Sequence, residues 1–139
     1  MEIYKIKGDR ITELVKTTFS EERIDEARDL QKFIINSIEA IDKDLFIISS
    51  EFGDWEDSKR RIDLLCIDKD ANIVVVELKR TEDGGHMELQ SIRYAAMVSN
   101  MTFEKTVKAY SKYLNKSNIT DIDAQEAILD FLEWSEINE

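Results

Sequence analysis

Three charged residues interrupt the most apolar part of the chain. Asp63 lies within the run RIDLLCID, and Glu77 and Lys79 end the run IVVVELK. Because side chains alternate between the two faces of a strand, Glu77 and Lys79 share one face, about 7 Å apart. Carboxylates in an apolar layer repel each other and are costly to desolvate unless a cation lies between them. The pattern therefore indicates either a metal site or a structural ion pair.

A magnesium-type ion would meet this need. Mg²⁺ is usually bound through one or two carboxylates and keeps several waters; Asp63, Glu77 and the Leu78 carbonyl offer suitable oxygens. Lys79 would then lie beside a metal-bound water and could activate it for attack on phosphorus. In the alternative reading, Lys79 only neutralises Glu77 or Asp63, because this spacing also arises by chance in a chain with 35% charged residues.

The segment 86–100 is predicted to be helical and to contribute two further polar side chains. Gln90 and Tyr94 are four residues apart, so they share one helix face. There they could hydrogen-bond a water or a phosphate oxygen; alternatively, Tyr94 belongs to the core and Gln90 to the surface. His86 follows two glycines, and we interpret it as a capping or surface group rather than a catalytic base.

Three strands must position these residues. The segments 45–52, 61–68 and 72–79 are rich in apolar and β-branched residues. A short, turn-forming loop separates the second from the third, which predicts an antiparallel meander with Asp63 and Glu77 on neighbouring strands. The nearly continuous apolar run of the third strand is typical of the middle of a sheet, buried on both faces.

Helices are predicted to flank this sheet, at about 21–41, 86–100, 102–116 and 121–134. The first has an apolar arc at 100° per residue, and Glu26 falls at the margin of that arc. Glu26 is therefore either a surface charge or a group aimed into a site. Residues 1–20 show no clear pattern, so the expected order is one helix, three strands and three helices.

Composition narrows the class of protein. The chain has 139 residues, which suits one domain, and no apolar run reaches the roughly 20 residues of a membrane helix, so we expect no membrane partner. One cysteine and one histidine exclude an internal disulfide and the usual zinc sites. Cys66 is interpreted as a buried strand residue rather than a nucleophile, and a reducing cytoplasm is the expected compartment.

The net charge of −11 is unevenly distributed. Residues 118–139 hold seven of the 30 acidic residues and none of the 19 basic ones, so the first 117 residues have a net charge of only −4. An acidic chain is normally a poor candidate for binding nucleic acid. The nearly balanced body weakens that objection.

Basic residues gather near the ends of the predicted strands and on the helix at 102–116. They are Lys59, Arg60, Arg61 and Arg80 near the strands, and Lys105, Lys108, Lys112 and Lys116, the lysine stripe, on the helix. Such clusters suit contact with a phosphate backbone without reading of bases. Two alternatives remain: a solvated face that balances the acidic tail, or pairing with that tail that occludes DNA.

In combination these motifs resemble the PD-(D/E)xK nuclease superfamily. The matching positions are Asp63, Glu77-Leu78-Lys79 and Gln90-Ser91-Ile92-Arg93-Tyr94, the last being similar to the QxxxY motif of the RecB-like branch. The upstream segment EARDLQKFI and the EF pair before the second strand resemble nuclease domains of NucS-like DNA repair endonucleases. The resemblance covers about residues 21–101.

The resemblance implies an α/β, restriction-endonuclease-like core, in which the meander begins a central mixed sheet flanked by helices. It also implies a divalent-metal-dependent endonuclease, with Mg²⁺ or Mn²⁺ as cofactor and DNA as substrate, acting in DNA repair, restriction or defence. The alternative is a non-catalytic nucleic-acid-binding or protein-docking module that retains this fold.

The same resemblance implies roles for individual residues. Asp63, Glu77 and the Leu78 carbonyl would bind the metal, and Lys79 would activate water. Gln90 and Tyr94 would support Lys79. Two further acids are candidates: Glu26 matches an extra acid beside the metal in many of these enzymes, and Glu51 is a weaker candidate on an edge or loop.

Such a core normally continues with further strands after residue 101, where only helices are predicted here. We therefore expect a single nuclease-like domain over 1–139, with a core at 21–101, a helical part at 102–139 and an acidic tail at 118–139. The missing strands would lie in a longer protein of which this is the N-terminal part, or a second chain, as in a homodimer, would complete the sheet. Alternatively, the domain is a reduced form of such a core.

Overall fold

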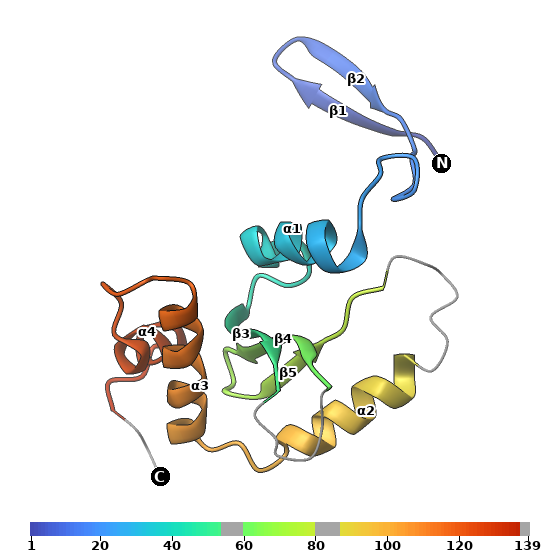
Figure 1. Ribbon diagram of the computed structural model, residues 1–139. Helices are drawn as coiled ribbons and strands as arrows, with labels where there is room; N and C mark the ends of the chain where they lie inside the picture. Colours follow the sequence, from blue (N-terminus) through green and yellow to red (C-terminus); the bar gives the residue numbers. More distant parts are fainter. Residues whose placement is uncertain (54–59, 80–86, 137–139) are drawn as a thin grey trace.

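The computed structural model describes residues 1–53, 60–79 and 87–136, except for the side chains of residues 26, 27, 87 and 88 (Figure 1). Two sheets and four α-helices make a mixed α/β fold. In chain order the elements are β1 (Ile3–Lys7), β2 (Arg10–Leu14), the π-helix η1 (Glu26–Leu30), α1 (Gln31–Asn36), the 3₁₀-helix η2 (Ile38–Ala40), β3 (Leu45–Phe52), β4 (Ile62–Asp68), β5 (Ile73–Val76), α2 (Met87–Val98), α3 (Phe103–Lys116) and α4 (Ala124–Leu132).

The central sheet has the order β3-β4-β5 and is antiparallel, which confirms the predicted meander. Leu64 of β4 pairs with Ser50 of β3 and with Val76 of β5. The described residues contain only the antiparallel meander, so the larger mixed sheet that it was expected to begin stays a prediction. A parallel neighbour would require a crossover strand after α2, and the described chain there forms α3 and α4 instead.

The third strand differs from its prediction in length and in place. β4, rather than β5, is the middle strand: its residues 64–66 are fully buried, whereas all four residues of β5 are half-buried. β5 ends at Val76, three residues early, because the Leu78 N–H donates to the Asp63 carboxylate (2.8 Å). The antiparallel register would direct that N–H to the backbone of Ile62.

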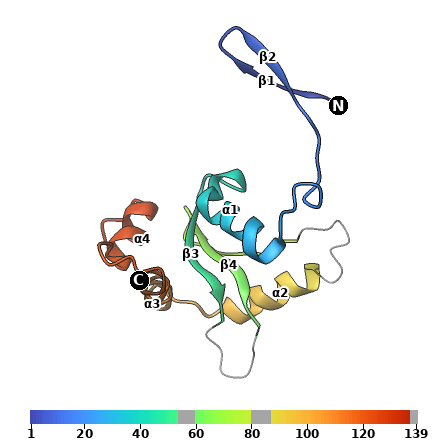
Figure 2. The ribbon, with the colours of Figure 1, turned by 45° about the horizontal axis from the view of Figure 1, so that its top comes forward.

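The sheet separates two apolar cores. On one face Leu64, Cys66 and Leu78 pack against the α1 region. The opposite face is covered by α2, α3 and α4 (Figure 2), whose buried residues include Tyr94 and Ile128. Cys66 is buried, and burial raises the pKa of its thiol to about 12, which agrees with a core residue rather than a nucleophile.

The predicted continuous helix at 21–41 was wrong. The chain makes three short pieces, η1, α1 and η2, because local side chains compete with a regular helix. Asp25 accepts the N–H of Arg28 at Oδ1, and Asp29 accepts the N–H of Asp25 at Oδ2 (2.9 Å each). Ser37 then leaves helical geometry at φ −150° and ψ 54°.

Residues 1–20, for which no element was predicted, contain the hairpin β1–β2. Lys7 pairs with Arg10, leaving a two-residue turn of Gly8 and Asp9, and Gly8 takes a φ of 62°. A Gly-X pair between two apolar and β-branched runs is a recognised hairpin signal that could have revealed it. All ten strand residues are exposed, and the hairpin stands away from the rest of the chain (Figure 1).

The three C-terminal helices were predicted correctly apart from their ends. Thr102 caps α3 by accepting the Lys105 N–H, and Asp123 caps α4 by accepting the Glu126 N–H. α4 ends before Glu133, which has a left-handed φ of 58°, so this helix is shorter than the predicted 121–134. Within the described ranges no helix has the length and apolar character needed to cross a membrane.

Candidate active site

Asp63 and Glu77 meet where β4 and β5 separate. Leu64 pairs with Val76, so extending the antiparallel register by one residue brings Asp63 opposite Glu77. The Asp63 side chain is half-buried and reaches toward the end of β5, since its Oδ2 accepts the Leu78 N–H. The structure therefore brings together the two acids that the sequence placed on neighbouring strands.

Glu77 has one satisfied oxygen and one unsatisfied oxygen. Gln90 Nε2 donates to its Oε2 (3.0 Å), whereas Oε1 is buried and has no hydrogen-bond partner among the described residues. A buried acceptor left without a partner typically costs about 1–3 kcal/mol. An oxygen of this kind at the meeting point of two carboxylates is suited to a cation.

The environment also opposes ionisation of Glu77. Burial first, and then the Asp63 charge, raise the pKa of Glu77 to about 7, while Lys79 acts in the opposite direction. A bound cation would reverse this balance, because it favours the charged carboxylate.

The two other residues of the ELK motif differ in environment. Leu78 is 9% exposed and packs in the core under the α1 region, with Leu64 and Cys66. This anchor fixes the backbone between the two charged residues. Lys79 is half-buried, and its charge lowers the pKa of Glu77.

The two candidates on α2 lie together. Gln90 contacts Glu77, and Tyr94 is only 3% exposed within the core. Both line a pocket of about 530 Å³ together with Arg60, Arg93 and Leu89. Tyr94 is thus a core residue that also reaches a pocket beside the acid pair. Arg93, which the sequence did not single out, adds positive charge there.

Gln31 is a site residue that the sequence analysis missed. This residue of α1 is 9% exposed, and its Nε2 donates to Glu51 Oε1 and to the Asp63 carbonyl oxygen (2.9 Å each). A glutamine four residues after Ala27, on the apolar arc of the predicted helix, was the available signal. The Glu26 side chain lies outside the described residues, so its role as an extra acid beside the metal stays a prediction.

Glu51 lies closer to the acid pair than an edge or loop position implies. The neighbouring pairs Ser50–Leu64 and Phe52–Ile62 place Glu51 opposite Asp63. Glu51, Asp63 and Glu77 therefore occupy equivalent positions on three successive strands. Glu51 is itself exposed and has a φ of 51°.

The described acid pair suits a Mg²⁺ or Mn²⁺ ion that keeps several waters better than it suits a metal ion whose ligands are all protein side chains. No cluster of three acidic, histidine or cysteine side chains that could hold a metal occurs among the described residues. A site built on two carboxylates, a carbonyl and waters suits Mg²⁺, which dehydrates reluctantly. The unpartnered Glu77 Oε1 is the observation that supports this fit.

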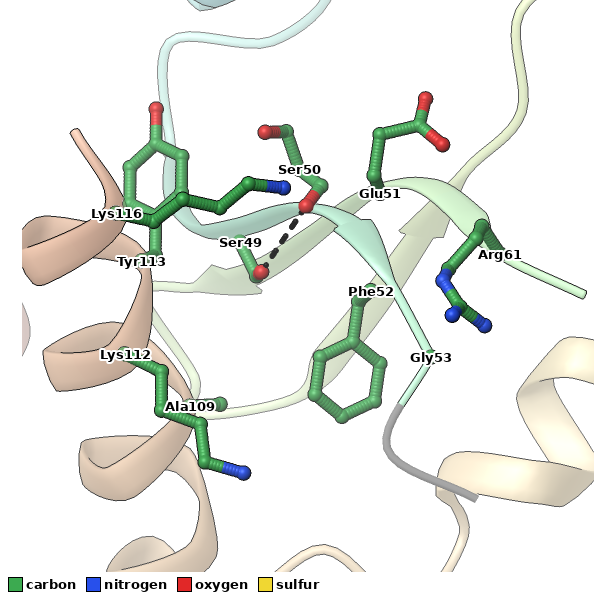
Figure 3. Close-up of a pocket in the computed structure, with 10 residues that line it drawn as sticks. All are labelled: Ser49, Ser50, Glu51, Phe52, Gly53, Arg61, Ala109, Lys112, Tyr113 and Lys116. Atoms are coloured by element: carbon green, nitrogen blue, oxygen red, sulfur yellow. Dashed lines mark hydrogen bonds between the residues drawn. The ribbon is translucent and has the colours of Figure 1, made fainter. Parts of the chain in front are cut away.

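Some of the predicted basic residues lie outside the described residues, and the others line three pockets. Lys59, Arg80 and His86 lie outside the described residues. Arg60 lines the pocket beside Gln90, and Arg61, Lys112 and Lys116 line a second pocket at the end of β3 (Figure 3). Lys105 and Lys108 line a third pocket, and Lys105 donates to the Asn100 carbonyl oxygen (3.0 Å).

The acidic tail is held by Lys69, which lies outside the lysine stripe. Lys69 Nζ donates to the Phe131 carbonyl oxygen and to Glu133 Oε1. Lys105, Lys108 and Lys116 make no ion pair with any described acid. The described contacts therefore give no support to occlusion of the stripe by the tail.

No protein-family model, curated protein or solved structure matches the chain.

Proposed function

We propose that this protein is a divalent-metal-dependent nuclease that hydrolyses phosphodiester bonds of DNA. The observation that supports the proposal is the convergence of Asp63 and Glu77 at the separating ends of β4 and β5, with Glu77 Oε1 buried and without a described partner.

Each residue of the site has a distinct role in this proposal. Asp63, Glu77 and the Leu78 carbonyl would hold Mg²⁺ or Mn²⁺, which supplies Lewis-acid activation of the phosphate and lowers the pKa of water. Lys79, as an ammonium group, would donate a hydrogen bond that orients the attacking water. Gln90 holds one oxygen of Glu77 in place, and Gln31 holds the backbone of Asp63.

The basic residues beside the acid pair favour a nucleic-acid substrate. Arg60 and Arg93 line the same pocket as Gln90 and Tyr94. Cations that flank a carboxylate pair attract the phosphate backbone, which the acids alone would repel. We further propose a cytoplasmic restriction-endonuclease-like enzyme of DNA repair, restriction or defence.

Nicking of supercoiled plasmid in Mg²⁺ or Mn²⁺ tests the proposal. Asp63→Asn, Glu77→Gln and Lys79→Ala are each expected to lower the nicking rate by at least about 100-fold. Asp130→Asn, an exposed acid of α4, is the matched control and keeps full activity. Equal nicking by all of these proteins would identify a contaminant and overturn the proposal.

The second candidate function is a non-catalytic nucleic-acid-binding module with the same fold. This module would bind DNA with the same affinity in the presence and in the absence of Mg²⁺. Substitution of Asp63 would therefore not weaken DNA binding through the loss of a metal ion. Calorimetric titration with MgCl₂ separates the two candidates, because only the nuclease requires binding that Asp63→Asn abolishes.

A further inference from the structure

A small basic pocket lies at the end of β3, next to the candidate active site (Figure 3). Its volume is about 150 Å³, below the roughly 300–1,000 Å³ typical of small-molecule sites. It can therefore take a chemical group of a few atoms rather than a whole nucleotide. Three cationic side chains line it, from Arg61, Lys112 and Lys116, together with hydroxyl groups of Ser49, Ser50 and Tyr113.

The Arg61 side chain is held in position by the backbone around it. Its Nη1 donates to the Arg60 carbonyl oxygen (2.9 Å). Gly53 makes room for this arrangement, because a Cβ there would overlap the Arg61 side chain and lie 2.7 Å from the Arg60 carbonyl oxygen. This hydrogen bond restricts the exposed guanidinium group at the edge of the pocket.

The two lysines come from consecutive turns of α3. Ala109 and Tyr110 pack that helix on the core, which fixes the positions of Lys112 and Lys116 above β3. Lys116 extends toward Ser50 (Figure 3) and forms no hydrogen bond or ion pair with a described residue. Its ammonium group is therefore available to a ligand.

One acid, Glu51, also lines the pocket and opposes an anion there. Gln31 donates to one of its oxygens, and its carboxylate points away from Lys112 (Figure 3). Among the described lining residues three are cationic and one is acidic, in a chain whose net charge is −11. This excess of basic over acidic lining residues favours an anion.

Glu51 also connects this pocket to the acid pair. It lies opposite Asp63, two strands away from Glu77, which corresponds to about 10 Å at the usual strand spacing. A nucleic-acid strand at the acid pair would therefore bring a neighbouring phosphate close to Arg61, Lys112 and Lys116.

We propose that this pocket binds a phosphate group of the nucleic-acid strand, next to the phosphate that is cut. The inference rests on the proposed function for the identity of the strand. Guanidinium and ammonium groups are the side-chain groups that bind phosphate oxygens most readily. The pocket would fix the register of the strand relative to Asp63 and Glu77.

The test is binding of a fluorescein-labelled DNA duplex of about 20 base pairs, measured by anisotropy in EDTA over a series of salt concentrations. Lys112→Ala/Lys116→Ala is expected to weaken binding at least about 10-fold and to reduce the slope of log K against log salt by about 1.8. The matched control, Lys7→Ala/Lys43→Ala, removes the same charge from exposed positions outside the pocket. Equal losses in both double variants would mean a general charge effect and overturn the proposal.

A second pair of variants tests the built part of the pocket. Gly53→Ala is expected to weaken binding as much as Arg61→Ala, since both remove the guanidinium group from its place. Far-ultraviolet circular dichroism checks that each variant is folded, and Arg61→Ala decides the question if Gly53→Ala does not fold. Wild-type affinity in folded Arg61→Ala contradicts the proposal.

The phosphate could belong to a strand or be a free ion, and a competition arm distinguishes these sources. Inorganic phosphate, at constant ionic strength, should displace the duplex only at millimolar or higher concentration. Displacement at micromolar concentration would identify a site for free phosphate and overturn the assignment to a strand. Because these measurements are made without a divalent metal, they stand even if nicking is absent, and lost nicking in Asp63→Asn does not affect them.

Discussion

At the scale of single residues, Glu77 depends most on its surroundings. Burial and the charge of Asp63 raise its pKa from the ordinary 4.5 to about 7. For an acid, a raised pKa in the folded state means that the folded state binds the proton more tightly than the unfolded state. Below about pH 4.5, Glu77 is protonated in both states and does not change the free energy of unfolding. As the pH rises from about 4.5 to about 7, Glu77 progressively lowers the free energy of unfolding.

Replacement of Glu77 by glutamine should remove this pH dependence. In EDTA, Glu77→Gln is expected to be more stable than the wild type above about pH 7, by about 1 kcal/mol after allowance for partial exposure, and equally stable below about pH 4.5. Urea unfolding at both pH values measures the difference. A difference that is constant with pH would mean that Glu77 does not titrate in this range.

Mg²⁺ should reverse the effect of the substitution. A ligand that binds only the folded protein raises its stability, so the melting temperature of the wild type should rise with MgCl₂ concentration. The rise should be larger at about pH 8 than at about pH 6, because protons compete with the cation for the Glu77 carboxylate. Thermal melts of Glu77→Gln provide the comparison, and an equal rise in that variant would place the cation elsewhere.

At the scale of elements, the ends of the strands matter more than their centres. β5 leaves the sheet at Val76, and the Asp63 carboxylate takes the Leu78 N–H in place of the regular ladder. Gln31 then connects α1 to the backbone of β4 at the same residue. The site is thus formed where regular structure stops and side chains replace backbone partners.

The hairpin β1–β2 should fold and melt separately from the body. Its ten strand residues are exposed, and an isolated two-stranded hairpin is marginally stable at best. Deletion of residues 1–16 is therefore expected to change the melting temperature of the remaining chain by less than about 2 °C. Circular dichroism melts of both proteins check this, and a decrease of more than about 5 °C would show that the hairpin stabilises the body.

At the scale of the whole molecule, the acidic tail is part of the core. Ile128 and Leu132 of α4 are 0% and 5% exposed and pack in the same cluster as Tyr94 and Tyr110. The helix α4 therefore carries acidic residues and, on another face, apolar residues that pack in the core beside the sheet. Lys69 fixes its C-terminal end through Phe131 and Glu133.

Truncation after residue 117 should therefore destabilise the protein. Loss of the buried Ile128 and Leu132 alone is expected to lower the free energy of unfolding by about 3–6 kcal/mol. Urea unfolding of the truncated and full chains measures this. Glu133→Gln is the control, because it neutralises charge in the tail without removing apolar surface, and it should cost less than about 1 kcal/mol. An unchanged transition after truncation would contradict the described packing of α4.

The amino-acid sequence alone determined the elements whose pattern is local. Residues 45–52 were predicted as a strand with the bounds that β3 has, and the short loop after β4 predicted its antiparallel return. The helices α3 and α4 were predicted for the same reason, because the residues that form a helix face and its cap lie within a few residues of each other in the sequence. The pairing of Asp63 with Glu77 follows from the same local rules, since one short loop joins their strands.

Only the tertiary structure decided features that join distant segments. Gln31 bridges Glu51 and Asp63 across 20 and 32 residues, and Gly53 matters because the Arg61 side chain occupies the space of its missing Cβ. Likewise, Gln90 of α2 donates to Glu77 Oε2, whereas no described residue donates to Oε1. This difference depends on how α2 packs beside the sheet. Periodicity reports the face on which a residue lies, whereas these contacts depend on which faces meet, and that is determined by packing of the whole chain.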